Sequence, residues 1–160
     1  MQTDIPDSIQ FRVLGVPAPG GSKNGIPFRR NNGRLGVNLV ESSKRASPWR
    51  RLVTLRALEA MAGRLPLVGP VELSIEFVMS RPKAHFNAKG QLHPWAAEAC
   101  HIKAPDCTKL TRSTEDALKT VLWADDSQVV RQYISKRFRR PDEQPGAIVT
   151  VRTIQVGDSQ

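Results

Sequence analysis

The sequence has few cysteines, few aromatic residues and no long apolar run. Its 160 residues include 2 cysteines and 6% aromatic residues. No apolar stretch approaches the roughly 18 residues that a membrane helix needs, so we expect no membrane partner. The N-terminal residues also lack the apolar segment of a secretory signal peptide. Together with the low cysteine count, these absences predict a cytoplasmic protein whose thiols are reduced.

Acidic residues are scarce relative to basic ones. The chain has 24 Lys and Arg against 15 Asp and Glu, which gives a formal net charge of +9 at pH 7. Such a charge suits a polyanionic partner, because Lys and Arg release condensed counterions from nucleic acid. A basic protein that is merely soluble has the same composition, so the charge alone favours nucleic acid only weakly.

The charges are unevenly distributed along the chain. Basic residues gather in segments 23–34, 44–56 and 131–140, whereas acidic residues gather between positions 106 and 126. An enzyme that uses a metal ion to act on a polyanion needs both kinds of surface. Basic side chains hold the phosphates, and carboxylates hold the metal ion.

The apolar pattern predicts a single α+β domain over residues 1–160, with a mixed or antiparallel sheet and two main helices. Period-2 alternation and β-rich composition predict strands over 8–16, 35–40, 71–79, 129–138 and 147–156. We expect Ser47 to cap the first helix, Pro48 to occupy its first position and the helix to end near Ala62. The second is expected to take Thr108 as its N-cap and to bury Leu110.

Two segments are expected to be loops. Residues 17–32 are rich in Gly, Pro and Asn, which is typical of turns. Residues 81–104 show no sustained period and contain scattered Pro, Gly and Asn, so we interpret them as a long flexible loop. Loops of that length are usually functional or mobile.

Asp106 and the Asp125–Asp126 pair are the acidic residues that invite a functional reading. Each has an ordinary structural explanation as well, since a carboxylate is favourable before a helix and adjacent acids are common in turns. The helix between them is roughly 20 Å long, so their proximity in sequence does not establish a site. Asp116 lies within that helix, where an i, i+4 ion pair with Arg112 would account for it.

Two segments together resemble the RusA-type crossover junction endodeoxyribonucleases. The first reads P-D-C-T-K-L-T-R from Pro105 to Arg112 and continues to D-A-L at 116–118, and the second reads D-D-S-Q-V-V over 125–130. The family pattern is P-D-x-D-N-L-x-K, three residues, D-A-L, then D-D-x-Q-V-V and a downstream Lys, for which Lys136 is in place. The resemblance extends over most of the chain and looks like an actinobacterial or phage branch.

The resemblance implies a RusA-like homodimer that cuts four-way (Holliday) DNA junctions in recombination, repair or phage replication. Mg²⁺ is the implied cofactor, with Mn²⁺ as a substitute and no small-molecule cofactor. Asp106, Asp125 and Asp126 are the implied metal ligands, and Arg112 and Asp116 join them as catalytic residues. We expect phosphates of the DNA to contact six basic residues, which are Lys23, Arg29, Arg30, Lys44, Lys109 and Lys136.

The sequence departs from the family pattern at two positions. Thr108 stands where the family has its second acid, and it offers a neutral oxygen in place of a carboxylate, which weakens metal binding. Arg112 stands where the family has Lys; it can clamp a phosphate bidentately but cannot exchange a proton near pH 7. Two alternatives therefore stay open: a branched-DNA-binding protein that has lost cleavage, and an RNA nuclease.

Overall fold

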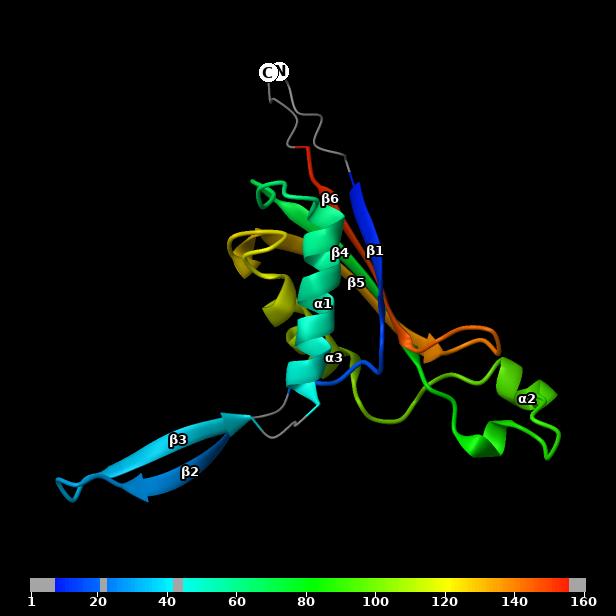
Figure 1. Ribbon diagram of the computed structural model, residues 1–160, viewed down its shortest axis with the longest axis horizontal. Coiled ribbons are helices and arrows are strands. Elements are labelled where there is room, and N and C mark those ends of the chain that lie inside the picture. The colour runs from blue at the N-terminus through cyan, green and yellow to red at the C-terminus, as the bar shows by residue number, and fades with distance from the viewer. Residues whose placement is uncertain (1–7, 21–22, 42–44, 156–160) are drawn as a thin grey trace.

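The computed structural model describes residues 8–20, 23–41 and 45–155, with backbone alone for 23–25 and 38–41. It contains a four-stranded sheet, a separate two-stranded hairpin and two main helices (Figure 1). The strands are β1 (Ser8–Leu14), β2 (Lys23–Arg29), β3 (Leu35–Glu41), β4 (Val71–Met79), β5 (Val129–Phe138) and β6 (Gly146–Thr153). The helices are α1 (Ala46–Met61), α2 (Pro94–Ala97) and α3 (Cys107–Leu118), with 3-10 turns η1 (Lys83–His85) and η2 (Asp126–Gln128). The predicted α+β class, with a mixed sheet and two main helices, is confirmed.

The sheet has the strand order β1-β6-β4-β5. β6 pairs antiparallel with both of its neighbours, whereas β4 and β5 are parallel. Parallel neighbours require a long crossover connection, and the segment that contains α3 supplies it. Along β4, Leu73, Ile75 and Phe77 are buried while the residues between them are half-buried, as the alternating sequence predicts.

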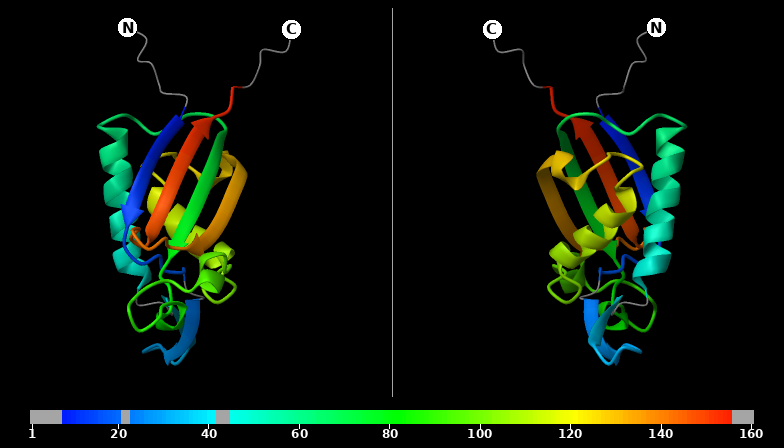
Figure 2. Two further views of the ribbon diagram at one scale, coloured as in Figure 1. Left: turned by 90° about the vertical axis from the view of Figure 1, so that its right-hand side faces the viewer. Right: turned by 90° about the vertical axis from the view of Figure 1, so that its left-hand side faces the viewer.

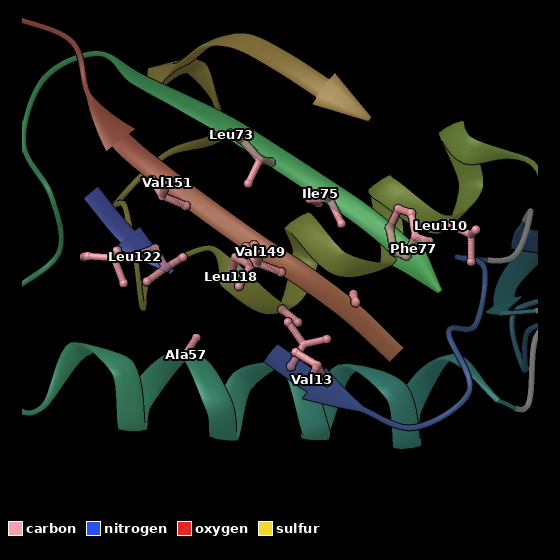
Figure 3. Packing of buried hydrophobic residues seen from close by; sticks show 14 of the residues in the cluster. Val13, Ala57, Leu73, Ile75, Phe77, Leu110, Leu118, Leu122, Val149 and Val151 are labelled. Atoms are coloured by element: carbon pink, nitrogen blue, oxygen red, sulfur yellow. The ribbon is translucent and has the colours of Figure 1, made fainter. Parts of the chain in front are cut away.

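α1 and α3 cover one face of the sheet and leave the other face open (Figure 2). Figure 3 shows Ala57 of α1 and Leu118 of α3 facing Val149 of the sheet across the core. Trp49 is 1% exposed, and its indole Nε1–H donates a 3.1 Å hydrogen bond to Oγ1 of Thr114. This contact joins the two helices, and burying each such large side chain stabilises the fold by about 2 to 3 kcal/mol.

The predicted N-caps of both helices are wrong. Helix α1 begins at Ala46 and takes Arg45 as its N-cap in place of the expected Ser47. At α3 the N-cap is Asp106, whose carboxylate accepts a 2.8 Å hydrogen bond from the backbone N–H of Lys109. Thr108 is instead the second residue of α3, because Asp is a stronger N-cap than Thr and its negative charge also suits the helix dipole.

Both predicted loops contain regular structure. β2 lies within the 17–32 segment, because its backbone pairs with β3 in a ladder that runs from Lys23–Glu41 to Arg29–Leu35. Residues 81–104 contain η1, α2 and a β-bridge between Phe86 and Leu92; the flexibility of this segment stays a prediction. Within the parts of the chain that the structure describes, no helix has the length and apolarity to cross a bilayer.

Candidate active site

A groove of about 310 Å³ runs between α3 and β5. Residues of α3 at spacings of three and four line one wall, so they share one face of the helix. The lining residues are Cys107, Thr108, Thr111, Arg112, Glu115, Gln132 and Ile134. The opposite face of α3 is buried in the core. The groove therefore exposes the two positions, 108 and 112, at which the sequence departs from the motif that it resembles.

Glu115 supplies the carboxylate in the lining of this groove. Its side chain accepts a hydrogen bond from Nε2 of Gln132 on β5. Burial raises the pKa of Glu115, and the nearby charges of Asp126 and Asp116 raise it further. The sequence interpretation did not select Glu115 as a site residue. Its position seven residues after Thr108 and three after Arg112, on one helical face, was the available signal.

Asp126 is not part of the groove lining, but it lies near enough to Glu115 for its charge to raise the pKa of that carboxyl. Its Oδ1 accepts a 3.0 Å hydrogen bond from the indole Nε1–H of Trp123, and its Oδ2 lies 3.5 Å from Nζ of Lys119. Trp123 is fully buried. A rigid donor in the core therefore fixes one oxygen of the Asp126 carboxylate.

Asp125 has a local structural role beside it. Its carboxylate accepts a 2.9 Å hydrogen bond from the backbone N–H of Ser127, and the side chain of Gln128 accepts from the backbone N–H of Asp125. This reciprocal arrangement is a capping box that starts η2. The bond from Ser127 and then the charge of Lys119 hold the pKa of Asp125 below its ordinary value.

Asp106 lies at the far end of α3. Nine residues separate it from Glu115, which corresponds to about 14 Å along a helix. Nζ of Lys136 donates to the carbonyl oxygens of Lys103 (2.8 Å) and Pro105 (2.9 Å), so β5 holds the segment that precedes Asp106. One subunit therefore does not bring Asp106 together with Asp126.

The acidic, cysteine and histidine side chains that the structure describes do not form a complete metal cage within one subunit. Among the described residues, no group of three or more His, Cys, Asp or Glu is arranged to hold a metal ion. The carboxylates of Asp106, Asp125 and Asp126 are accessible, with side chains 59%, 63% and 43% exposed. The metal-binding roles expected for these three residues stay predictions.

Asp116 faces α1, away from the groove lining. Its Oδ2 lies 3.7 Å from an Nη of Arg50, and both residues line a depression between α1 and α3. The ion pair expected with Arg112 is not formed, since Arg112 makes no ion pair with any residue that the structure describes. Arg112 is exposed at the groove and keeps its charge for another partner.

Five of the six residues expected to contact DNA are described, and they lie in three places. Arg29 and Arg30 are exposed on the β2–β3 hairpin. Lys23 begins β2, but its side chain lies outside the described part, as does all of Lys44. Lys109 is exposed at the start of α3, with Nζ 3.7 Å from Asp106. Lys136 uses its ammonium to hold residues 103–105, so its expected phosphate contact stays a prediction.

Comparison with known proteins places the chain in a family. Residues 20–152 match the family described as Endodeoxyribonuclease RusA. The match covers most of the chain and includes both motif segments, so the protein belongs to the RusA endodeoxyribonuclease family. It is also similar to the uncharacterized protein YqaN of Bacillus subtilis (strain 168), with 27% identity over 156 residues. That alignment covers 92% of this chain and 98% of YqaN.

Proposed function

We propose that the protein is a Mg²⁺-dependent endodeoxyribonuclease that resolves four-way DNA junctions as a homodimer. Recombination, repair or phage replication in the cytoplasm would supply such junctions. The observation that carries the proposal is the groove between α3 and β5. It presents Arg112 and Glu115 one helical turn apart, and the charge of Asp126, whose carboxylate Trp123 fixes, acts on Glu115. The chain around this groove has a net charge of +9.

Arg112 is the residue that we assign to the scissile phosphate. Its guanidinium carries a permanent charge and a planar set of donors that matches two phosphate oxygens. No ion pair with the described part of the chain competes for that charge. Arg112 therefore positions the phosphate and stabilises the negative charge that develops on it during hydrolysis.

The carboxylates near Asp126 suit Mg²⁺ in their chemistry. Mg²⁺ is a hard ion that usually takes one or two carboxylates together with waters and phosphate oxygens. Asp126 and Glu115 would supply two carboxylates, each held by a hydrogen bond from Trp123 or Gln132. A bound Mg²⁺ supplies Lewis-acid stabilisation of the phosphate and the leaving oxygen. Because these hydrogen bonds already orient the two carboxylates, little of the free energy of Mg²⁺ binding is needed to order them.

The homodimer is proposed from the separation of Asp106 and Asp126. If both carboxylates serve one site, a second copy of the chain must supply one of them, because α3 keeps them apart within a subunit. A two-fold dimer also suits a four-way junction, since resolution requires symmetric nicks in two strands.

A synthetic four-way junction tests cleavage. We expect paired nicks that require Mg²⁺ and disappear in EDTA. Asp126→Asn should abolish nicking while junction affinity stays equal or rises, because the substitution removes a negative charge near phosphates. Asp142→Asn, an exposed change in the β5–β6 turn, is the matched control and should nick normally. Tight binding of the wild type without nicks would instead support a DNA-binding protein of the same fold, which the neutral Thr108 favours.

Mixed dimers test whether each site draws on two subunits. Asp106→Asn and Asp126→Asn homodimers should each be inactive. If the two carboxylates of a site come from different subunits, a mixed dimer of the two variants keeps one intact site and nicks one strand. If each site lies within one subunit, the mixed dimer is inactive, and the two-subunit arrangement is wrong.

A further inference from the structure

The β2–β3 hairpin projects from the body of the protein as a separate arm (Figure 1). Its two strands pair only with each other. The described side chains of residues 26–37 are exposed, and Gly36 alone among them is buried. An isolated hairpin has little stability of its own in water, so a partner that binds this arm would stabilise it.

Both faces of the arm combine apolar and basic side chains. On one face the ring of Phe28 lies over Gly36, where an added Cβ would come within 2.7 Å of the ring and 3.2 Å of Nε of Arg30. Arg30 and Phe28 therefore share that face. Arg29 lies opposite Leu35 in the ladder, and the alternation of the strand places this pair on the other face.

The tip of the arm is an ordered turn. The N–H of Gly33 donates to the carbonyl of Arg30, and the N–H of Arg30 donates to the carbonyl of Arg34, each at 2.8 Å. Gly33 has φ +78°, which is the left-handed region that favours glycine. Oδ1 of Asn32 also accepts from the N–H of Arg34 at 3.1 Å. The arginines are therefore presented from a defined backbone.

The charge of the arm is not neutralised from within. Residues 23–41 contain four basic residues and one acid, Glu41, so the arm has a net charge of +3. None of Arg29, Arg30 and Arg34 forms an ion pair with any described residue. Three guanidinium groups without an ion-pair partner lie within six residues and repel one another. A bound polyanion would relieve this repulsion, which favours its binding.

We propose that the β2–β3 arm enters the major groove of one duplex arm of the branched DNA. The inference rests on the proposed function, because it assigns a second contact with the same substrate. A two-stranded ribbon fits the major groove, whose walls place phosphates on both sides. Arginines on both faces of the ribbon match two phosphate walls, whereas a ribbon that lies flat on DNA needs them on one face. The asparagine and arginine side chains at the tip reach the edges of the bases.

Salt dependence measures the contribution of the arm. The variant Arg29→Gln, Arg30→Gln, Arg34→Gln should bind a synthetic four-way junction more weakly, by about tenfold per arginine at 0.1 M salt. Its slope of log affinity against log salt concentration should be shallower than that of the wild type by about 3. The charge-matched control is Arg56→Gln, Arg64→Gln, Arg152→Gln, which changes exposed arginines of α1, the following turn and β6. This control should lose at most a small part of the slope, and circular dichroism checks that both variants are folded.

Dimethyl sulfate footprinting tests the groove, because the reagent methylates guanine N7 in the major groove. The wild type and Asp126→Asn should protect guanines on a duplex arm, and the hairpin variant should lose that protection. Two outcomes would overturn the proposed role of the arm while leaving the proposed nuclease intact. The wild type could bind without N7 protection, or the hairpin variant could bind like the control. A wild type that binds no junction overturns both. Loss of the dimer in the hairpin variant, measured by sedimentation, would show that the arm binds a second copy of the chain and overturn the DNA assignment.

Discussion

The indole N–H of Trp123 donates a 3.0 Å hydrogen bond to Oδ1 of Asp126. Trp123 is fully buried, whereas the side chain of Asp126 is 43% exposed. The core of the protein therefore orients a surface carboxylate whose charge acts on Glu115. A catalytic group whose geometry is set in this way needs little reorganisation when the substrate binds.

Trp123→Phe should reduce nicking more than it reduces stability. The substitution removes the donor to Asp126 and part of a buried ring, at a cost of about 2 kcal/mol in the free energy of unfolding. We expect the nicking rate of the folded variant to fall about tenfold, since the carboxylate is no longer held. Trp49→Phe is the matched control, because it also loses a buried indole hydrogen bond, to Thr114. Equal nicking by the two variants would show that the Trp123 bond has only a structural role.

Thr108→Asp should strengthen the binding of Mg²⁺. The new carboxylate would lie on the groove face of α3, at the position where the family has its second acid. We expect the Mg²⁺ concentration that gives half-maximal nicking to fall by about tenfold, which corresponds to about 1.4 kcal/mol. Thr108→Asn, which is neutral and of similar size to Asp, should leave that concentration unchanged. An unchanged Mg²⁺ titration in both variants would place position 108 outside the metal site.

Glu115→Gln should change how stability depends on pH. The pKa of Glu115 is raised in the folded protein, first by burial and then by Asp126 and Asp116. The folded state therefore binds the proton more tightly than the unfolded state, and stability is lost as pH rises through the raised pKa. Removing the carboxylate removes this loss. Urea denaturation at pH 4 and pH 8 should show that the free energy of unfolding of the variant, relative to that of the wild type, is greater at pH 8. The same difference in unfolding free energy at both pH values would contradict the assignment.

Glu143→Gln should show the opposite dependence on pH. Arg137, which donates two hydrogen bonds to Glu143, lowers the pKa of that carboxyl to about 2. Its contribution to stability is therefore present above its unfolded value of 4.5 and is lost as pH falls towards 2. We expect the variant to lose about 2 kcal/mol at pH 7, because Arg137 loses its two charge-assisted hydrogen bonds to Glu143 and keeps Glu76 as its remaining carboxylate partner. The loss should shrink at pH 3, and an equal loss at both values would show that packing dominates.

Much of the fold followed from local patterns. β4 could be predicted because its apolar residues alternate with polar ones, and in the sheet it lies between β6 and β5. The burial of Trp49 and Trp123 followed from their positions among other apolar residues. β2 could not be predicted, since Gly25 and Pro27 are typical of turns. The strand exists because β3 supplies a partner ladder, and pairing between separate segments is not encoded in either segment alone.

The sequence by itself determined the chemistry of this protein: a basic chain, carboxylates in two motif segments and an arginine one helical turn after Thr108. Only the tertiary structure decided which of these groups are neighbours. Packing of β5 along α3 brought Gln132 to Glu115 across 17 positions of sequence, whereas the rigid length of α3 kept Asp106 away from Asp126. A helix fixes distances along its own axis, but the contacts across a groove depend on which strand lies beside it.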